Sequence, residues 1–369
     1  MGRQLPTRLV VKVGSSSLTR ADGGLDLNRI DRLAGALADL VGHGHEVVLV
    51  SSGAVAAGLA PLGMRWRPSG IVDQQAAAAV GQGLLVAQWR QAFQAYHHHV
   101  AQVLLTTSDV TRRSTYVTVR ECLRDLIARG VIPVINENDA VATDEIRFGD
   151  NDRLAALVAQ AIEADLLVLL TDVDGLYDRP PSQPSARLID RVESWDDVAV
   201  AAVSGAGSSV GTGGMVTKLE AAKIAWACGI PTLVTAADRV EQVCAGENVG
   251  TYFVGGDRRP GQRLAWVAYA ASVDGTVEID AGALDALRRH GSSLLAAGVT
   301  AVSGDFRAGS VVALVHGGAE VGRGVASVDA RVATAMMGLR MGEMAAMGIE
   351  CPRPLIHRDD LVLYASPRP

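Results

Sequence analysis

The chain has 369 residues, of which 49% are hydrophobic and 20% are charged, and a formal net charge of −6 at pH 7. This length and apolar content predict two folded domains, or one large and one small domain. The acidic balance argues against a general affinity for nucleic acid or anionic membranes, and no apolar run approaches the ~18 residues of a membrane span.

The cysteines and the N-terminal residues indicate the cellular compartment in which the protein is expected. The four cysteines are scattered and form no C-x-x-C pair, so neither a zinc site nor a disulfide framework is predicted. The first residues contain no long apolar segment of the kind that a secretion signal has. We therefore expect a soluble protein of the reducing cytoplasm.

Short, almost continuously apolar segments alternate with helical patterns along the first two thirds of the chain. We predict strands at residues 8–13, 46–52, 100–105, 131–136, 165–171 and 230–235. We predict helices at residues 27–41, 74–96, 115–129, 152–164 and 218–228. Such apolar runs suit strands that are covered on both faces. The alternation predicts an α/β fold with three layers, in which helices cover both faces of a mostly parallel central sheet.

Polar or glycine-rich turns follow four of the predicted strands. Each turn could by itself close a loop or cap a helix. Ligands of parallel sheets bind beyond the carboxyl ends of the strands, so the recurrence of these turns predicts a binding site at that edge. The turns lie at residues 14–17, 51–54, 136–139 and 171–175.

Lysine is scarce in this chain. Only Lys12, Lys218 and Lys223 occur among 34 Lys and Arg residues, which leaves 31 arginines. A site that needs a compact ammonium on a flexible stem cannot accept a planar guanidinium. Lys12 stands two residues before the first glycine turn, and Lys218 ends GTGGMVTK, a glycine-rich segment that opens a helix and favours an anion. Chance retention is the alternative, but two lysines at two such loops predict a phosphate site, with Lys223 at the surface.

Three common nucleotide-binding patterns do not fit. GTGGMVTK lacks the Gly before its Lys and the Ser or Thr after it that a P-loop requires. No G-x-G-x-x-G follows the first strand, and the H-R-D and D-F-G signatures of protein kinases are missing. A different scaffold for phosphoryl transfer is needed.

Five segments carry a more specific pattern: VVKVGSSSLT, SSGAVAAG, PVINENDAVATDEIRFGDND, LLTDVDGLY and GTGGMVTKLEAA. Together they closely resemble the glutamate 5-kinase family of the amino acid kinase superfamily, and the match spans nearly the whole chain. The long third segment, residues 133–152, is the most specific one. Ser15 and Ser51 stand where the family commonly has Thr, and both keep the hydroxyl.

The resemblance implies transfer of the ATP γ-phosphoryl group to the side-chain carboxylate of L-glutamate, the first step of proline biosynthesis. Phosphoryl transfer relies mainly on positioning and charge neutralisation, and a carboxylate acceptor needs no general base. The run His97, His98 and His99 is therefore read as a solvated loop, not as a metal site. Mg²⁺ is expected on the ATP phosphates, with no metal site of the protein's own. The alternatives within the superfamily are kinases of acetylglutamate, aspartate or uridylate.

The resemblance also assigns roles to residues. Lys12 and Lys218 would neutralise the transferred phosphoryl group, and Asp152 would hold both ammonium groups. The residues implied in glutamate binding are Ser52, Gly53, Asp139 and Asn151. The residues implied in ATP binding are Lys12, Gly14, Thr171, Asp172, Thr212, Gly213, Gly214, Met215, Val216, Thr217 and Lys218.

The C-terminal part has a different pattern. We predict a catalytic domain at residues 1–256, a linker at 257–274, and a β-rich domain at 275–369 that resembles a PUA domain. Such domains contact RNA in other proteins, but this one has nine Arg, no Lys, ten Asp plus Glu and two aromatic residues, which argues against RNA binding. The family resemblance further implies a homo-oligomer, dimer or tetramer, and feedback inhibition by proline at or near the glutamate pocket.

Overall fold

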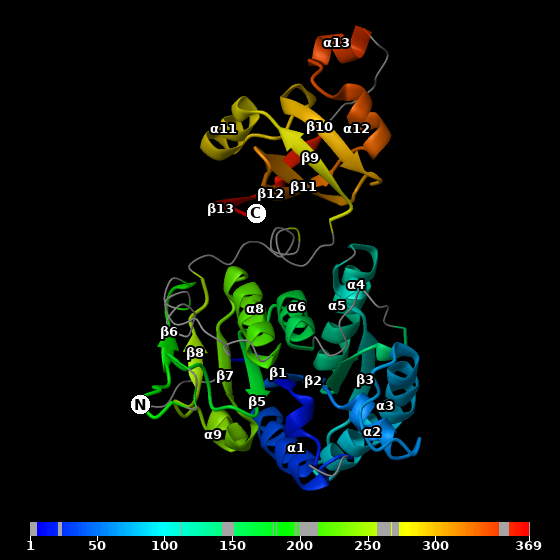
Figure 1. The fold of residues 1–369 in the computed structure, drawn as a ribbon, viewed down its shortest axis with the longest axis vertical. Helices are drawn as coiled ribbons and strands as arrows, with labels where there is room; N and C mark the ends of the chain where they lie inside the picture. The colour runs from blue at the N-terminus through cyan, green and yellow to red at the C-terminus, as the bar shows by residue number, and fades with distance from the viewer. Residues whose placement is uncertain are drawn as a thin grey trace. The chain divides into compact units, whose positions relative to one another are not determined.

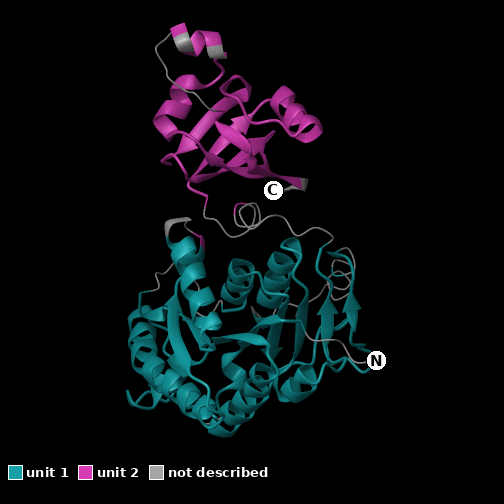
Figure 2. Cartoon of the chain, turned by 180° about the vertical axis from the view of Figure 1, so that it is seen from behind, with its two compact units in different colours: residues 1–110, 115–259 teal, residues 111–114, 260–369 magenta. Residues whose placement is uncertain are grey.

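The computed structural model divides into two compact units, residues 1–110 with 115–259, and residues 111–114 with 260–369 (Figure 2). The domain limits proposed from the sequence remain predictions. Thr212, most of the expected linker and part of the long family motif lie outside the described residues. The structure describes residues 6–20, 24–111, 113–141, 151–179, 181, 183–195, 198, 213–256, 267, 273–346 and 354–368.

The first unit is built on an eight-stranded sheet with the order β3-β4-β2-β1-β5-β7-β8-β6 (Figure 1). Its strands are β1 (Arg8–Val13), β2 (Glu46–Ser51), β3 (Val100–Leu105), β4 (Ile132–Glu137), β5 (Leu166–Thr171), β6 (Arg191–Val192), β7 (Thr232–Ala236) and β8 (Thr251–Phe253). Every neighbouring pair is parallel except β7 with β8. The six strands predicted from apolar runs are present, and the mostly parallel sheet is confirmed.

Helices cover both faces of this sheet, as predicted for three layers (Figure 1). They are α1 (Leu27–Gly42), α2 (Ala54–Leu59), α3 (Ile71–Gln94), α4 (Thr107–Thr111), α5 (Arg113–Ala128), α6 (Asn151–Ile162), α8 (Gly213–Ala227) and α9 (Val240–Cys244), with short 3₁₀ turns η1 (Ser15–Ser17) and η2 (Asp139–Val141). Helix α6 is buried nearly all round, which fits a helix enclosed by its neighbours. None of the described helices combines the length and the apolar character that crossing a bilayer requires.

The alternation of side chains along β1 decides where its lysine lies. Leu9, Val11 and Val13 enter the apolar core that α1, α3 and α9 share. Because successive residues of a strand point to opposite faces, Lys12 lies on the other face, where α6 and α8 pack. The side chain of Lys12, near the carboxyl end of this apolar strand, therefore points at the start of α6.

Helices α2 and α3 approach each other closely through glycine. A Cβ added at Gly81 would lie 1.9 Å from the carbonyl oxygen of Ala54, and one added at Gly58 would lie 1.9 Å from that of Ala77. Neither contact can be relieved by turning a side chain, because both neighbours are backbone atoms. This packing fixes α2 and the loop before it, where Gly53 has φ of 107°.

Gly81→Ala is expected to destabilise the protein by about 1–3 kcal/mol, because the new methyl group forces the two backbones apart. Gly83→Ala is the matched control, since nothing lies within 4 Å of the Cβ position on the same helix. Thermal unfolding of the two variants measures the difference. Equal midpoints would contradict the close packing of α2 on α3.

The second unit has its own sheet and core. The sheet order is β10-β9-β11-β12-β13, antiparallel apart from β9 with β11. Phe306, Met336 and Leu355 are among its buried side chains. The predicted small β-rich unit is confirmed. Its strands are β9 (Gly275–Ile279), β10 (Val299–Gly304), β11 (Val311–His316), β12 (Ala319–Ala326) and β13 (Ile356–Arg368), and its helices are α11 (Ala281–His290), α12 (Ala330–Met336) and α13 (Met341–Ala346).

Candidate active site

A cavity of about 790 Å³ lies at the carboxyl ends of β1, β2, β4 and β5. This is the edge at which ligands of parallel sheets bind. Gly213 and Met215, at the start of α8, are not among the described residues that line it. The predicted site residues that do line it are Lys12, Gly14, Ser52, Gly53, Asp139, Asn151, Asp152, Thr171, Asp172, Gly214, Val216, Thr217 and Lys218.

The two scarce lysines meet on one carboxylate. Lys12 Nζ lies 2.7 Å from Asp152 Oδ1, and Lys218 Nζ lies 3.2 Å from Asp152 Oδ2. All three side chains are at least nine-tenths buried. Thr217 Oγ1 also donates to Asp152 Oδ2 at 2.7 Å. Two positive charges and one negative charge therefore share the floor of the cavity, with a local excess of positive charge.

Asp152 is held in its ionised form. Burial alone raises its pKa, but the ammonium groups of Lys12 and Lys218 outweigh burial and bring the pKa below its ordinary value. Its position as the second residue of α6 adds the favourable field of a helix N-terminus. Since the carboxylate stays charged, it can fix both lysines in place at neutral pH.

The start of α8 supplies a second feature suited to an anion. The helix begins with Gly213 and Gly214, and its first turns border the cavity. Lys218 Nζ also donates to the carbonyl oxygen of Gly214 at 3.0 Å, which holds the lysine against its own helix. Backbone N–H groups at a helix start and a fixed ammonium together favour a phosphate group.

Asn151 lies in a network of amides between three elements. Its Nδ2 donates to Ser52 Oγ at 3.0 Å and to Asn136 Oδ1 at 3.0 Å, and its Oδ1 accepts from the Glu137 N–H at 3.3 Å. Asn136 Nδ2 in turn donates to Gln82 Oε1 at 2.7 Å. The Asn151 amide group therefore donates to Ser52 and to Asn136, and a direct bond from Asn151 to a substrate stays a prediction. The supporting amides of Gln82 and Asn136 were not among the residues assigned from the sequence.

Asp139 is a buried carboxylate with an oxygen that can still accept a hydrogen bond. Its side chain is 8% exposed, and its Oδ1 accepts no hydrogen bond from any described residue. Burial raises the pKa of Asp139 to about 6, against the opposing field of the Arg67 guanidinium. A cationic group bound in the cavity would supply the missing partner.

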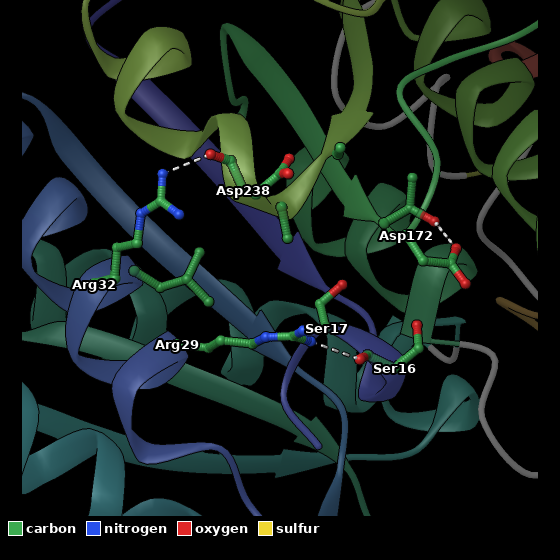
Figure 3. Close-up of a pocket in the computed structure, with 10 residues that line it drawn as sticks. Ser16, Ser17, Arg29, Arg32, Asp172 and Asp238 are labelled. Carbon is green, nitrogen blue, oxygen red and sulfur yellow. Dashed lines mark hydrogen bonds between the residues drawn. The ribbon is translucent and has the colours of Figure 1, made fainter. Parts of the chain in front are cut away.

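A smaller cavity of about 230 Å³ adjoins the first one, and the two share Ser16, Thr171 and Asp172 (Figure 3). Figure 3 shows Arg29 Nη1 donating to the Ser16 carbonyl oxygen at 3.3 Å and Arg32 Nη2 donating to that of Asp238 at 2.7 Å. Thr171 Oγ1 donates to Asp172 Oδ1 at 3.0 Å. Thr171 and Asp172, which were predicted to bind the nucleotide, thus border both cavities.

The histidine run lies away from this region, on the turn between α3 and β3. His97 and His99 are exposed, and His98 is half-buried. In the part of the chain that the structure covers, no three His, Cys, Asp or Glu side chains gather closely enough to hold a metal ion.

Two family models match the chain. Residues 7–236 match the amino acid kinase family, and residues 275–346 match the PUA domain. Among solved structures, the carbamate kinase from Giardia lamblia bound to AMP-PNP superimposes with a TM-score of 0.50 at 17% identity, over 67% of this chain and 98% of that one. The first unit therefore has the fold of an amino acid kinase.

Curated relatives give a finer assignment. The glutamate 5-kinase of Salinispora arenicola is 51% identical over 96% of this chain and 97% of its own length. That of Streptomyces coelicolor is also 51% identical, over 96% of each chain. The chain belongs to the amino acid kinase family and, within it, to the glutamate 5-kinases. The prediction from the sequence motifs is confirmed over the alternative of an RNA-binding module.

Proposed function

We propose that this protein transfers the γ-phosphoryl group of ATP to the side-chain carboxylate of L-glutamate, which gives L-glutamyl 5-phosphate, the first step of proline biosynthesis. The observation that carries the proposal is the convergence of Lys12 and Lys218 on Asp152 in a cavity at the carboxyl edge of the sheet. The identity of 51% to glutamate 5-kinases selects the substrate.

The chemistry requires charge neutralisation more than proton transfer. The acceptor carboxylate is ionised at pH 7 and attacks phosphorus without a general base. Negative charge on the transferred group is then spread over its oxygens, in a transition state that nearby cations stabilise. Each lysine carries three N–H donors, so Lys12 and Lys218 can keep their bonds to Asp152 while they bind phosphate oxygens.

The substrate and the nucleotide would approach from different sides of the two lysines. We place L-glutamate beside Ser52, Gly53, Asp139 and Asn151, with its ammonium group at the Asp139 carboxylate. We place the ATP phosphates at the start of α8, over Gly14 and residues 212–218, with the rest of the nucleotide near Thr171 and Asp172. Mg²⁺ would come with the phosphates, because this ion keeps most of its water ligands and is usually bound through phosphate oxygens.

Trapping of the acyl phosphate tests the proposed reaction. The full-length protein is incubated with ATP, Mg²⁺ and hydroxylamine together with L-glutamate, L-aspartate, N-acetylglutamate or uridylate in parallel. We expect a hydroxamate with L-glutamate and little or no transfer to the other three. Phosphoryl transfer to uridylate, or a hydroxamate from aspartate or N-acetylglutamate alone, would contradict the assignment.

Asp139→Asn is expected to weaken glutamate binding. Loss of a charge-assisted hydrogen bond raises the KM for L-glutamate about 10- to 100-fold, with the KM for ATP little changed. The pKa of about 6 also predicts a pH dependence in the wild type, because only ionised Asp139 attracts the ammonium group. Its kcat/KM for L-glutamate should fall about tenfold per pH unit below pH 6, whereas the variant should show no such step.

Thermal unfolding gives an independent check on Asp139. Because burial raises the folded-state pKa, the protonated form is favoured on folding and the ionised form costs stability at pH 7.5. The substrate-free Asp139→Asn variant should therefore unfold at a higher temperature than the wild type at pH 7.5, and this advantage should shrink towards pH 4. A lower midpoint at pH 7.5 would show that Asp139 has a partner that stabilises its charge.

Three further properties rest on the family resemblance and stay proposals. We propose a homo-oligomer, dimer or tetramer, and feedback inhibition by proline at or near the glutamate pocket. We also propose a cytoplasmic location, where the product would enter proline biosynthesis. Light scattering and inhibition assays with proline test the first two.

A further inference from the structure

Arg67 is a cation of the reaction cavity that the sequence motifs did not single out. It lies on the loop between α2 and α3 and lines the same cavity as Lys12, Asp139 and Lys218. Its Nη2 donates to Gln74 Oε1 at 3.2 Å, so α3 holds the guanidinium by one of its five N–H donors.

Arg67 and Asp139 carry opposite charges at one cavity but do not neutralise each other directly. The guanidinium is close enough to oppose the rise in the pKa of Asp139 that burial causes. Even so, within the described part of the chain no ion pair of 4.0 Å or less joins the two side chains. Asp139 Oδ1 is buried and accepts no hydrogen bond from any described residue. A buried carboxylate oxygen without a partner is costly, so this arrangement points to a ligand between the two charges.

The head of an α-amino acid has the complementary pair of charges. Its ammonium group donates to a carboxylate, and its carboxylate accepts two parallel N–H bonds from a guanidinium. We propose that Arg67 binds the α-carboxylate of L-glutamate, so that Arg67 and Asp139 together recognise the zwitterionic head of the substrate. The proposal rests on the proposed function and deepens it, because it explains how the enzyme selects which of the two substrate carboxylates reacts.

The selection follows from charge. Lys12 and Lys218 attract any carboxylate, so the lysine pair alone cannot distinguish the α-carboxylate of glutamate from that of its side chain. With the α-carboxylate on Arg67, the only carboxylate left to face the phosphoryl group is that of the side chain. Arginine suits this task better than lysine, since its planar fork matches both oxygens of a carboxylate.

The test compares two substrates in one variant. L-glutamate and its α-amide, L-isoglutamine, have the same reacting carboxylate, but the amide lacks the charge that Arg67 would bind. We expect Arg67→Gln to lower kcat/KM for L-glutamate about 10- to 100-fold, chiefly because KM rises. The kcat/KM for the α-amide should change less than about threefold. The KM for ATP should stay within about twofold of the wild-type value. If turnover of the α-amide is too slow to follow, its inhibition constant against L-glutamate supplies the same comparison.

Arg65→Gln is the matched control, because Arg65 is an exposed arginine of the same loop that is not among the described residues lining the cavity. This variant should leave kcat/KM unchanged for both L-glutamate and its α-amide. The proposal is wrong if Arg67→Gln leaves the KM for L-glutamate unchanged, if it weakens both substrates equally, or if it raises the KM for ATP instead. Failure of the proposed function looks different, since the wild-type protein would then form no hydroxamate from L-glutamate.

Discussion

Lys218→Met is expected to lower kcat about 10²- to 10³-fold. Removal of one hydrogen-bond donor that stabilises a negatively charged transition state has an effect of this size in other enzymes. Methionine keeps the length and much of the volume of the lysine stem, so the change removes the ammonium group while leaving the packing of α8 nearly intact. Lys12→Met should have an effect of the same size. The double variant should lose less than the product of the single losses, because both lysines act on one phosphoryl group.

Lys223→Met is the matched control for these variants. Lys223 lies on the same helix, with its Nζ 6.0 Å from the centre of the Trp195 ring, and it is not among the described residues lining the cavity. Its kcat should stay within about twofold of the wild-type value. A kcat for Lys218→Met within tenfold of the wild type would contradict a role for that lysine in transfer.

Asp152→Asn is expected to damage both folding and catalysis. The variant leaves two buried ammonium groups side by side without a countercharge, and removal of one partner of a buried ion pair costs about 3–5 kcal/mol. The kcat should also fall about 10²-fold or more, since the lysines lose the group that positions them. Thermal unfolding and hydroxamate formation measure the two effects.

Binding of a phosphate ligand distinguishes charge repulsion between Lys12 and Lys218 from a non-specific loss of stability in the variant. ATP would supply the negative charge that Asp152→Asn removes, so saturating Mg²⁺ and ATP should raise the unfolding midpoint of the variant more than that of the wild type. Asp73→Asn, at an exposed carboxylate in the first turn of α3, should leave the midpoint and kcat nearly unchanged. An Asp152→Asn variant as stable as the wild type without ligand would contradict the charge cluster.

The sequence predicted the elements whose pattern is local. Five of the six predicted strands gave a continuous apolar signal because nearly every position in them is buried. The edge strand β3 has one buried residue, yet its sequence VAQVLL is apolar enough to give the same signal. Helix α2 was missed because its six residues, AVAAGL, are small and too few to show helical periodicity. The strands β6 and β8 were missed because they are only two and three residues long.

The polar turns after the strands predicted which edge of the sheet holds the site. The roles of single residues could be predicted only where a rare residue type or a family motif marked them. The rarity of lysine singled out Lys12 and Lys218, but only the resemblance to a family named Asp152 as the group between them. Arg67 carried no such signal, because arginine is the common cation of this chain. Gln82 lies on α3, which is far from Asn136 in the sequence. Its hydrogen bond with Asn136 forms only in the folded protein, so no sequence pattern could indicate it.

A crystal structure of the complex with AMP-PNP, Mg²⁺ and L-glutamate would test most directly whether the paired lysines bind the transferred group. The account predicts that Nζ of Lys12 and Nζ of Lys218 both lie within about 3.2 Å of γ-phosphate oxygens, with Asp152 still contacting each ammonium. A ternary complex in which either ammonium stays beyond hydrogen-bond distance of the γ-phosphate would contradict it.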